Sequence, residues 1–299
     1  MYKHITLIIT AIIILIFNSV SAQNYDILTE LKNHKTKVYF SEGNDERAKI
    51  IAERCDNAIN YFNGIINFTP DVTLLILNQE DWWKFTNFPV YGMPHYNDNK
   101  TLVIATEDND FWKSFIPPLD KLPEELQNKI RNAYTNQDGN LSMMAFFDLL
   151  SLHELGHAFH FQADLQMQRF WMGELFANIF LHTYIAENEP EYLPALTVFP
   201  EMVVAGGTTE YKYTSLTDLE ERYDEIGQRY PKNYGWYQSR WHSAAKNIYN
   251  EGGKEVFVRL WTALKEKREK LSDSELADFL TNNVHQSVAD VLLKWDDFN

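Results

Sequence analysis

The stretch 151-SLHELGHAFHFQ-162 decides the interpretation of the chain, because it carries two histidines four residues apart with a glutamate directly after the first. On a helix, residues i and i+4 project from the same face, so His153 and His157 would present two imidazoles to one point. The apolar flanks predict a buried helix from Leu141 to about Gln162. Gly156 is unusual in a helix interior and is expected to permit the close approach of another element.

Two imidazoles at this spacing suit a zinc ion held by a rigid element. Glu154 lies one step around the helix, where it could act as general base toward a zinc-activated water. A hydrolytic zinc site keeps three protein ligands and one open position. The pattern with a third histidine needs glycine at 160 and histidine at 163, but the chain has His160 and Ala163.

Glu174 is the expected third ligand, because it follows His157 by 17 residues, which leaves room for a turn and a second helix over Gln166–Ala186. Asn178 is four residues further on the same face and could hydrogen-bond a ligating histidine, the alternative being a simple buried amide. We interpret His160 as an ordinary, partly exposed histidine, although it could line the cleft. A polar cluster of the two histidines and Glu174 without a metal remains the alternative.

The motifs HELGH and ELFAN together resemble those of the gluzincin metallopeptidases, the thermolysin-like and aminopeptidase-like group. The resemblance implies a zincin-like fold and one Zn²⁺ per chain, bound by His153, His157 and Glu174, with Glu154 as the base. The chain departs from the gluzincin pattern at Asn178, where aspartate is usual. This departure concerns the level of activity more than the metal.

The segment 231–253 is aromatic and resembles the C-terminal helix of aminopeptidase-like gluzincins. A donor is needed there to stabilise the oxyanion that forms during peptide hydrolysis. Tyr237 is the expected donor and Tyr234 the second choice, with Arg240 and His242 as further candidates. Packing of these side chains within the core is the alternative for each of them.

The N-terminal 22 residues have the pattern of a secretory signal peptide: Lys3, an uncharged apolar run, and small residues at positions 20 and 22. Cleavage before Gln23 would leave no membrane span and an exported protein, which could be periplasmic, on the cell surface or secreted. An uncleaved N-terminal membrane anchor is the alternative. The net charge of −15 argues against nucleic acid as a partner. Cys55 is the only cysteine, so no intramolecular disulfide can form, and it is expected to be a small buried hydrophobe.

The rest of the chain predicts an α+β fold in a single catalytic unit over residues 23–299. Residues 23–119 would form a small α/β lobe, with strands at 38–40, 71–77 and 101–106, a helix over Asp45–Ile66 and a loop at 87–99. The segment YGMP leading into the strand at 101–106 is either a substrate-binding edge strand or an internal strand.

Residues 120–299 would form a mainly helical lobe that carries the metal site. Asp120 is expected to cap a helix over residues 121–134, prolines to break the segment 188–203, and Ser272 and Glu275 to form a capping box.

The function favoured by these patterns is an exported zinc peptidase acting on a peptide or protein substrate. A catalytically weak or inactive binding protein of zincin fold is the main alternative, and a zinc hydrolase with a non-peptide substrate is a third. The sequence does not indicate an oligomeric state or a choice between endo- and exopeptidase activity.

Overall fold

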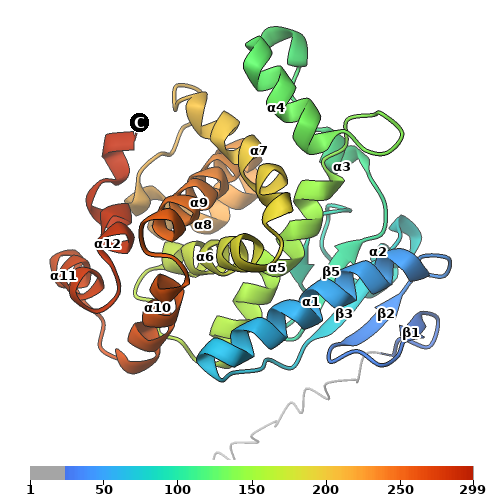
Figure 1. Ribbon diagram of the computed structural model, residues 1–299, viewed down its shortest axis with the longest axis horizontal. Helices are drawn as coiled ribbons and strands as arrows, with labels where there is room; N and C mark the ends of the chain where they lie inside the picture. Colours follow the sequence, from blue (N-terminus) through green and yellow to red (C-terminus); the bar gives the residue numbers. More distant parts are fainter. Residues whose placement is uncertain (1–23, 299) are drawn as a thin grey trace, which may run out of the picture.

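The computed structural model describes residues 24–298 and contains a five-stranded sheet within the first part of the chain (Figure 1). The strands are β1 (Thr29–Leu31), β2 (Lys37–Phe40), β3 (Thr73–Leu77), β4 (His95–Tyr96) and β5 (Thr101–Ala105). Their order is β1-β2-β3-β5-β4, with β2, β3 and β5 parallel and the two edge strands antiparallel to their neighbours. The predicted signal peptide lies outside the described residues.

The central strands β3 and β5 are almost completely buried. A parallel strand covered on both faces is apolar along its whole length, which explains the runs LLIL and LVIA. The three predicted strands are therefore confirmed. The predicted loop at 87–99 is wrong in part, because β4 lies within it and pairs with β5.

Helix α1 (Asp45–Ile66) has the predicted bounds. Its buried face packs on the sheet and on α5 (Met144–Gln162), as the period of its apolar residues requires. Arg47 fixes this packing, because its guanidinium donates to both carboxylate oxygens of Asp148 in α5 at 2.9 and 2.6 Å. It also donates to the carbonyl of Ala105 at the end of β5.

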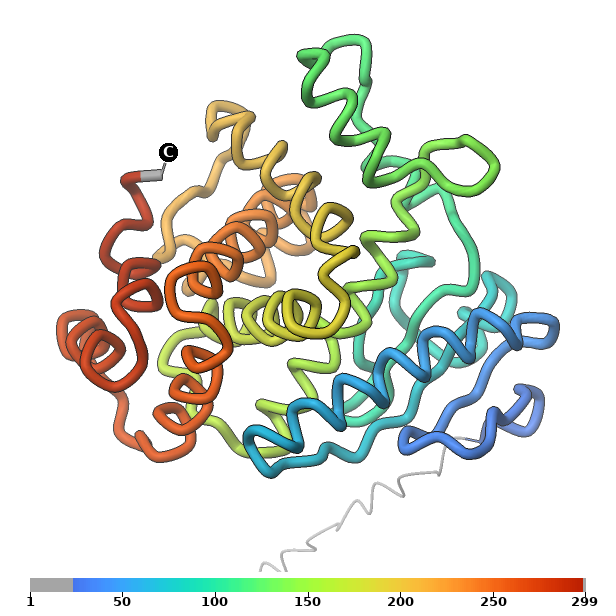
Figure 2. The backbone as a smooth tube through the Cα atoms, viewed as in Figure 1, coloured from blue at the N-terminus to red at the C-terminus, as the bar shows by residue number. Residues whose placement is uncertain are grey.

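After β5 the chain is mainly helical, and Figure 2 shows these helices passing from α5 to the side of the molecule opposite the sheet. The mixture of one sheet and many helices agrees with the predicted α+β class. Besides α1 and α5, the helices are α2 (Gln79–Phe85), α3 (Asp110–Lys113), α4 (Glu124–Tyr134), α6 (Phe170–Asn188), α7 (Leu193–Ala205), α8 (Leu216–Arg229), α9 (Pro231–Gly252), α10 (Lys254–Glu266), α11 (Asp273–Asn283) and α12 (Gln286–Leu293).

Two helix predictions need correction. Asp120 does not cap α4, because it lies in a short 3-10 turn and the helix starts only after Pro123. The segment 188–203 is not fully broken by its prolines, since it contains most of α7. Pro194 occupies the first turn of that helix, where its missing N–H is tolerated, and Pro200 remains inside the helix. The predicted Ser272–Glu275 capping box at the start of α11 is confirmed.

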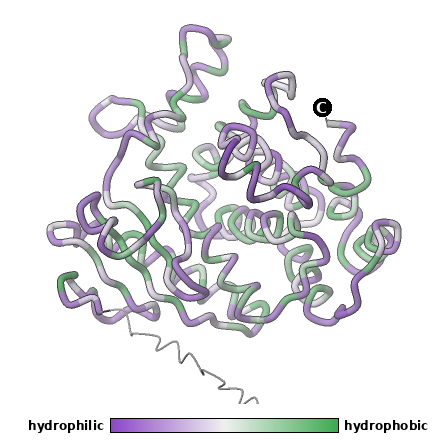
Figure 3. The backbone as a smooth tube through the Cα atoms, turned by 180° about the vertical axis from the view of Figure 1, so that it is seen from behind, coloured by the Kyte–Doolittle hydropathy of each residue, from purple (hydrophilic) through white to green (hydrophobic). Residues whose placement is uncertain are grey.

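Helices α5 and α6 cross at the centre of the molecule and are apolar on most sides. Figure 3 shows the corresponding contrast from behind: hydrophobic segments concentrate inside and hydrophilic ones in the outer loops. Gly156 is the contact point, because a Cβ added there would lie only 3.0 Å from the Cα of Ala177 in α6. The predicted close approach at this glycine is confirmed.

Cys55 is fully buried in α1, as predicted, and burial raises the pKa of its thiol to about 12. Among residues 24–298, no helix is both long and apolar enough to cross a membrane.

Candidate metal centre

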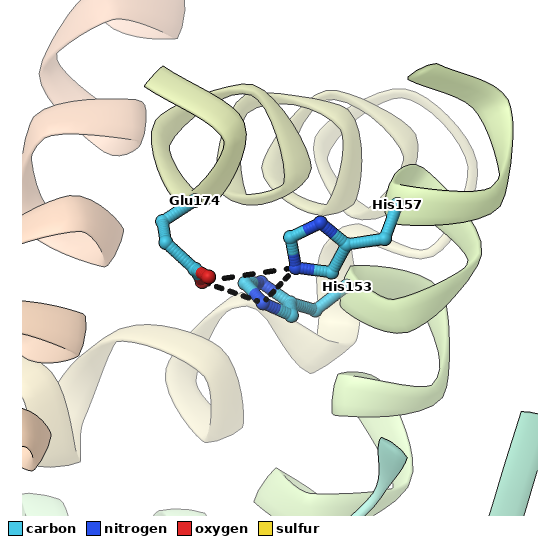
Figure 4. A group of neighbouring side chains, drawn as sticks. All are labelled: His153, His157 and Glu174. Atoms are coloured by element: carbon cyan, nitrogen blue, oxygen red, sulfur yellow. Dashed lines mark hydrogen bonds and ion pairs between the residues drawn. The ribbon is translucent and has the colours of Figure 1, made fainter. Parts of the chain in front are cut away.

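Helices α5 and α6 bring together His153, His157 and Glu174, the three residues predicted as metal ligands (Figure 4). The two Nε2 atoms of the histidines lie 3.1 Å apart. Glu174 Oε2 lies 3.3 Å from His153 Nε2 and 3.7 Å from His157 Nε2. These residues form a largely buried group that could hold a metal ion.

The spacing of the three ligand atoms suits a tetrahedral metal ion. Bonds of about 2.0–2.1 Å arranged tetrahedrally place neighbouring ligand atoms roughly 3.3 Å apart. The observed separations of 3.1, 3.3 and 3.7 Å bracket that value. Two imidazole nitrogens and one carboxylate oxygen are also a donor set that zinc accepts.

His160 completes the surroundings of His157 and corrects the prediction that it is partly exposed. Its side chain is buried, and its Nε2 lies 2.9 Å from His157 Nδ1. Burial, and then the neighbouring His157, lower the pKa of His160 to about 3. His160 is therefore neutral at pH 7, and its Nε2 can accept a hydrogen bond from the Nδ1–H of a His157 that uses Nε2 as a ligand.

His153 lacks the partner that was predicted for a ligating histidine. Its Nδ1 is buried without a hydrogen-bond partner among the described residues, and so is Oδ1 of Asn178. The predicted bond from a histidine to the Asn178 oxygen is therefore not formed, and the Nδ2 of Asn178 donates to the carbonyl of Glu174, one turn earlier in α6, at 3.0 Å. The structure thus leaves one buried nitrogen and one buried acceptor unused at this centre.

Glu174 is held by hydrogen bonds to both oxygens. Tyr223 of α8 donates to Oε1 at 2.8 Å, and the amide of Gln238 of α9 donates to Oε2 at 2.7 Å. Tyr234 joins the two donors, since its hydroxyl lies 3.0 Å from that of Tyr223 and accepts from Gln238 at 2.8 Å. Burial alone would raise the pKa of Glu174, but His157 and then His153 hold it well below its usual value, so the carboxylate is ionised.

Glu154 is placed differently from the three candidate ligands. Within the described part of the chain its carboxyl has no hydrogen-bond or ion-pair partner, so its oxygens can accept a proton from a small molecule. Burial raises the pKa of Glu154 to about 8, with His153 opposing this rise and Glu174 adding to it. A carboxyl with a raised pKa is suited to proton transfer near neutral pH.

Tyr237 does not join this group, which corrects the prediction that it stabilises an oxyanion. Its hydroxyl donates to the carbonyl of Ser215 at 2.7 Å, and its ring stacks on Trp295 near the C-terminus. Arg240 also contacts Trp295. Its guanidinium lies 4.0 Å from the centroid of the Trp295 ring and donates to the Trp295 carbonyl. Both side chains hold the C-terminal segment against α9.

The side of α9 that meets the centre carries Tyr234, Gln238 and His242, which are spaced four residues apart. His242 is buried, with its ring centroid 6.4 Å from that of His153. Sequence reasoning named Tyr234 and His242 but missed Gln238, although the i, i+4, i+8 spacing was a usable signal. It also missed Tyr223, for which the polar sequence of α8 gives no local signal.

The edge of the sheet nearest this centre is β4, whereas β5 is internal. Tyr96 of β4 has a buried hydroxyl without a partner among the described residues. Burial, and then the charge of Glu154, raise the pKa of Tyr96 well above its usual value, so β4 lies on the Glu154 side of α5. A cavity of about 450 Å³ opens beside this strand, lined in part by Phe88, His95 and Asn97.

Comparisons of the chain with protein-family models, with curated proteins and with solved structures give no match, so the interpretation of this centre depends on its geometry and chemistry.

Proposed function

We propose that the chain is an exported zinc-dependent peptidase of the gluzincin type, with a zincin-like arrangement of its sheet and helices. The observation that carries the proposal is the spacing of His153, His157 and Glu174, which fits a tetrahedral ion. The proposed ion is zinc, because other common divalent ions that prefer oxygen ligands would be poorly served by two imidazoles.

A zinc ion at this centre would supply Lewis acidity, polarising a peptide carbonyl and lowering the pKa of a nearby water. Glu154 is the proposed general base, since its carboxyl is unpartnered and close to the ligands. It would take a proton from the attacking water and pass that proton to the leaving amine. The raised pKa of Glu154 supports both steps, because the group can gain and lose a proton near neutral pH.

The proposed oxyanion donor is Tyr234 in place of Tyr237. Tyr234 belongs to the hydrogen-bonded group around Glu174, whereas the Tyr237 hydroxyl is occupied by Ser215. The hydroxyl of Tyr234 lies between two other polar side chains that also contact the centre, so it could turn toward a substrate oxygen.

The proposed substrate is a peptide or protein whose backbone adds to the sheet at β4. Strand β4 lies at the edge of the sheet, runs antiparallel to β5 and is on the Glu154 side of α5. Main-chain hydrogen bonds along such an edge would bind a substrate with little dependence on its side chains.

A second candidate is a zinc-binding protein of low or no activity, and the unpaired His153 Nδ1 favours it. An amide at Asn178 cannot raise the basicity of a ligand histidine as a carboxylate does, and here its oxygen makes no hydrogen bond with His153. The two candidates share the metal and differ in turnover.

The deciding experiment measures zinc content and peptide cleavage in the wild type and in the variants Glu154→Gln and Glu174→Ala. The peptidase predicts about one zinc per chain in the wild type and in Glu154→Gln, much less zinc in Glu174→Ala, and cleavage only in the wild type. Zinc without any cleavage of a diverse peptide library would favour the second candidate. A wild type that takes up no zinc after reconstitution would refute both.

A further inference from the structure

The candidate ligand Glu174 belongs to a closed ring of hydrogen bonds. Tyr223 of α8 donates to its Oε1 at 2.8 Å, and Gln238 of α9 donates to its Oε2 at 2.7 Å. Tyr234 of α9 closes the ring, because its hydroxyl lies 3.0 Å from that of Tyr223 and 2.8 Å from the amide nitrogen of Gln238. The ring therefore joins α6, α8 and α9 at one carboxylate.

The number of hydrogens in the ring determines the direction of each bond. An ionised carboxylate only accepts, so Tyr223 and the Gln238 amide must both donate to Glu174. Tyr223 thereby uses its single hydrogen, and Tyr234 must be the donor in the contact between the two hydroxyls. The second hydrogen of the Gln238 amide goes to Tyr234. Burial, and then the charge of Glu174, raise the pKa of Tyr223 and of Tyr234 well above the usual value, so both hydroxyls keep their hydrogens.

The two oxygens of Glu174 consequently have different surroundings. Oε2 faces both histidines, at 3.3 Å from His153 Nε2 and 3.7 Å from His157 Nε2 (Figure 4). Oε1 instead accepts from Tyr223. Because separate donors hold the two oxygens, the carboxylate cannot turn both of them toward an ion without breaking a bond of the ring.

A break in α8 lies directly before Tyr223. Arg222 has non-helical dihedral angles, with φ −132° and ψ 23°. Its guanidinium pairs with Glu225 at 3.3 Å and lies 5.6 Å from the centroid of the Tyr213 ring. The direction of the Tyr223 side chain is therefore set by a local feature of the backbone, and not by the helical period of the preceding turn alone.

We propose that Tyr223, Gln238 and Tyr234 are positioning residues, which restrict the glutamate ligand to one-oxygen coordination and so make the centre select a four-coordinate ion. This inference rests on the proposed function, because it concerns the metal centre of the proposed peptidase. Zinc accepts two imidazoles and one carboxylate oxygen in a four-coordinate site, whereas manganese prefers more oxygen donors in an octahedral one. A second oxygen from the glutamate would therefore favour manganese more than zinc.

The test measures the affinities of the purified, metal-free chain for zinc and for manganese by competition with a chromophoric chelator. The variants Tyr223→Phe and Gln238→Met each remove one donor to Glu174 with little change in volume. Tyr249→Phe is the matched control. The Tyr249 hydroxyl of α9 also donates to a carboxylate of α6, that of Glu187, at 2.8 Å, but it lies outside the ring.

Tyr223→Phe and Gln238→Met should bind zinc several-fold more weakly than the wild type, because the ligand is less well oriented. They should bind manganese more tightly, since the released carboxylate can offer its second oxygen. The ratio of zinc affinity to manganese affinity should therefore fall about tenfold in both variants. Tyr249→Phe should keep the ratio of the wild type.

Tyr234→Phe should give a smaller effect than the other two ring variants. Given the directions of the bonds, this substitution leaves both donors to Glu174 in place. Its affinity ratio should lie between those of the wild type and Tyr223→Phe. An effect larger than that of Tyr223→Phe would contradict the assigned directions and the role of the ring.

Cobalt supplies a spectroscopic measure that a purely structural role would not change. The cobalt-loaded wild type should show the intense visible bands of four-coordinate Co²⁺. Tyr223→Phe and Gln238→Met should show weaker bands, because a second carboxylate oxygen raises the coordination number. Two variants on different helices keep the test decisive if one of them fails to fold.

An equal fall in zinc and manganese affinity, with unchanged cobalt bands, would mean that the ring only supports the fold and would overturn the inference. An unchanged affinity ratio in both variants would do the same. These measurements need no turnover, so they decide the inference even if the wild type cleaves no peptide. A wild type that binds none of the three ions would refute the metal centre and the inference with it.

Discussion

His160 Nε2 lies 2.9 Å from His157 Nδ1, so one imidazole orients another at the centre. His160→Phe keeps the ring volume but removes the acceptor, and it should weaken zinc binding by about tenfold, as loss of such a partner commonly does. His160→Gln keeps a hydrogen-bond acceptor and should lose less zinc affinity than His160→Phe. Competition with a chromophoric chelator measures both affinities. Equal zinc affinity in the wild type and His160→Phe would show that the contact does not orient the ligand.

The hydroxyls of Tyr223 and Tyr237 make different contacts and should give different phenotypes. Tyr223→Phe removes a donor to Glu174, which should lower zinc affinity several-fold. Tyr237→Phe removes a donor to the Ser215 carbonyl, which should cost about 1 kcal/mol of unfolding free energy and leave zinc affinity unchanged. Zinc titration and urea denaturation of both variants check the pair. Loss of zinc affinity in Tyr237→Phe would show that the Tyr237 hydroxyl acts on the metal centre after all.

The grouping of the three candidate ligands could be predicted from sequence because their geometry is local. His153 and His157 lie one turn apart on a single helix, and Glu174 is on the next helix after a short connection. Helix α1 was predicted to the residue for the same reason, since its apolar period extends over its whole length. Local spacing determines such features before any tertiary contact is known.

The partners of Glu174 could not be found in this way, because they come from residues 49 and 64 positions away. Tyr223 lies on a mainly polar helix, where nothing in the pattern distinguishes a buried hydroxyl from an exposed one. The error over Tyr237 is one of helical phase. Tyr237 is three residues after Tyr234, which turns its side chain about 60° away from the face that meets the centre. Tyr234, from the same segment, is the tyrosine that contacts the partners of Glu174.

The titration of His182 should make the protein less stable in mild acid. Burial, and then Lys246, lower the pKa of this α6 histidine from the ordinary 6.5 to about 4. Between these values the unfolded state binds more protons than the folded state, so stability falls as the pH falls from about 6.5 to 4. The full contribution of His182 to the free energy of unfolding is roughly 3 kcal/mol, and about 2 kcal/mol of it should be lost between pH 7.5 and pH 5.

Urea denaturation of the zinc-free protein at pH 7.5 and pH 5 measures this loss for the wild type and for His182→Gln. Other buried histidines contribute to both proteins, so the relevant quantity is the difference between the two pH dependences. His182→Gln should lose less stability on acidification than the wild type. Identical losses would mean that His182 titrates in the folded protein as it does in the unfolded chain.

Gly156 couples the packing of α5 and α6 to the geometry of the candidate ligands. In Gly156→Ala the new Cβ would lie 3.0 Å from the Cα of Ala177 and 3.3 Å from the Cβ of Phe180. The first of these neighbours is backbone, so the helices must separate, at a cost of about 1–3 kcal/mol. Alanine gains up to about 1 kcal/mol over glycine in a helix, which leaves a net destabilisation. Since the same separation moves both histidines relative to Glu174, zinc affinity should fall as well.

Gly64→Ala in α1 is the matched control, because nothing lies within 4 Å of a Cβ added there. This variant should be stabilised by up to about 1 kcal/mol and should bind zinc as the wild type does. Urea denaturation should therefore show Gly156→Ala to be less stable than the wild type and Gly64→Ala to be more stable. Zinc titration should show a lower affinity for Gly156→Ala alone. A Gly156→Ala protein as stable as Gly64→Ala, with undiminished zinc affinity, would show that the close approach of α5 and α6 does not determine how the three ligands are placed.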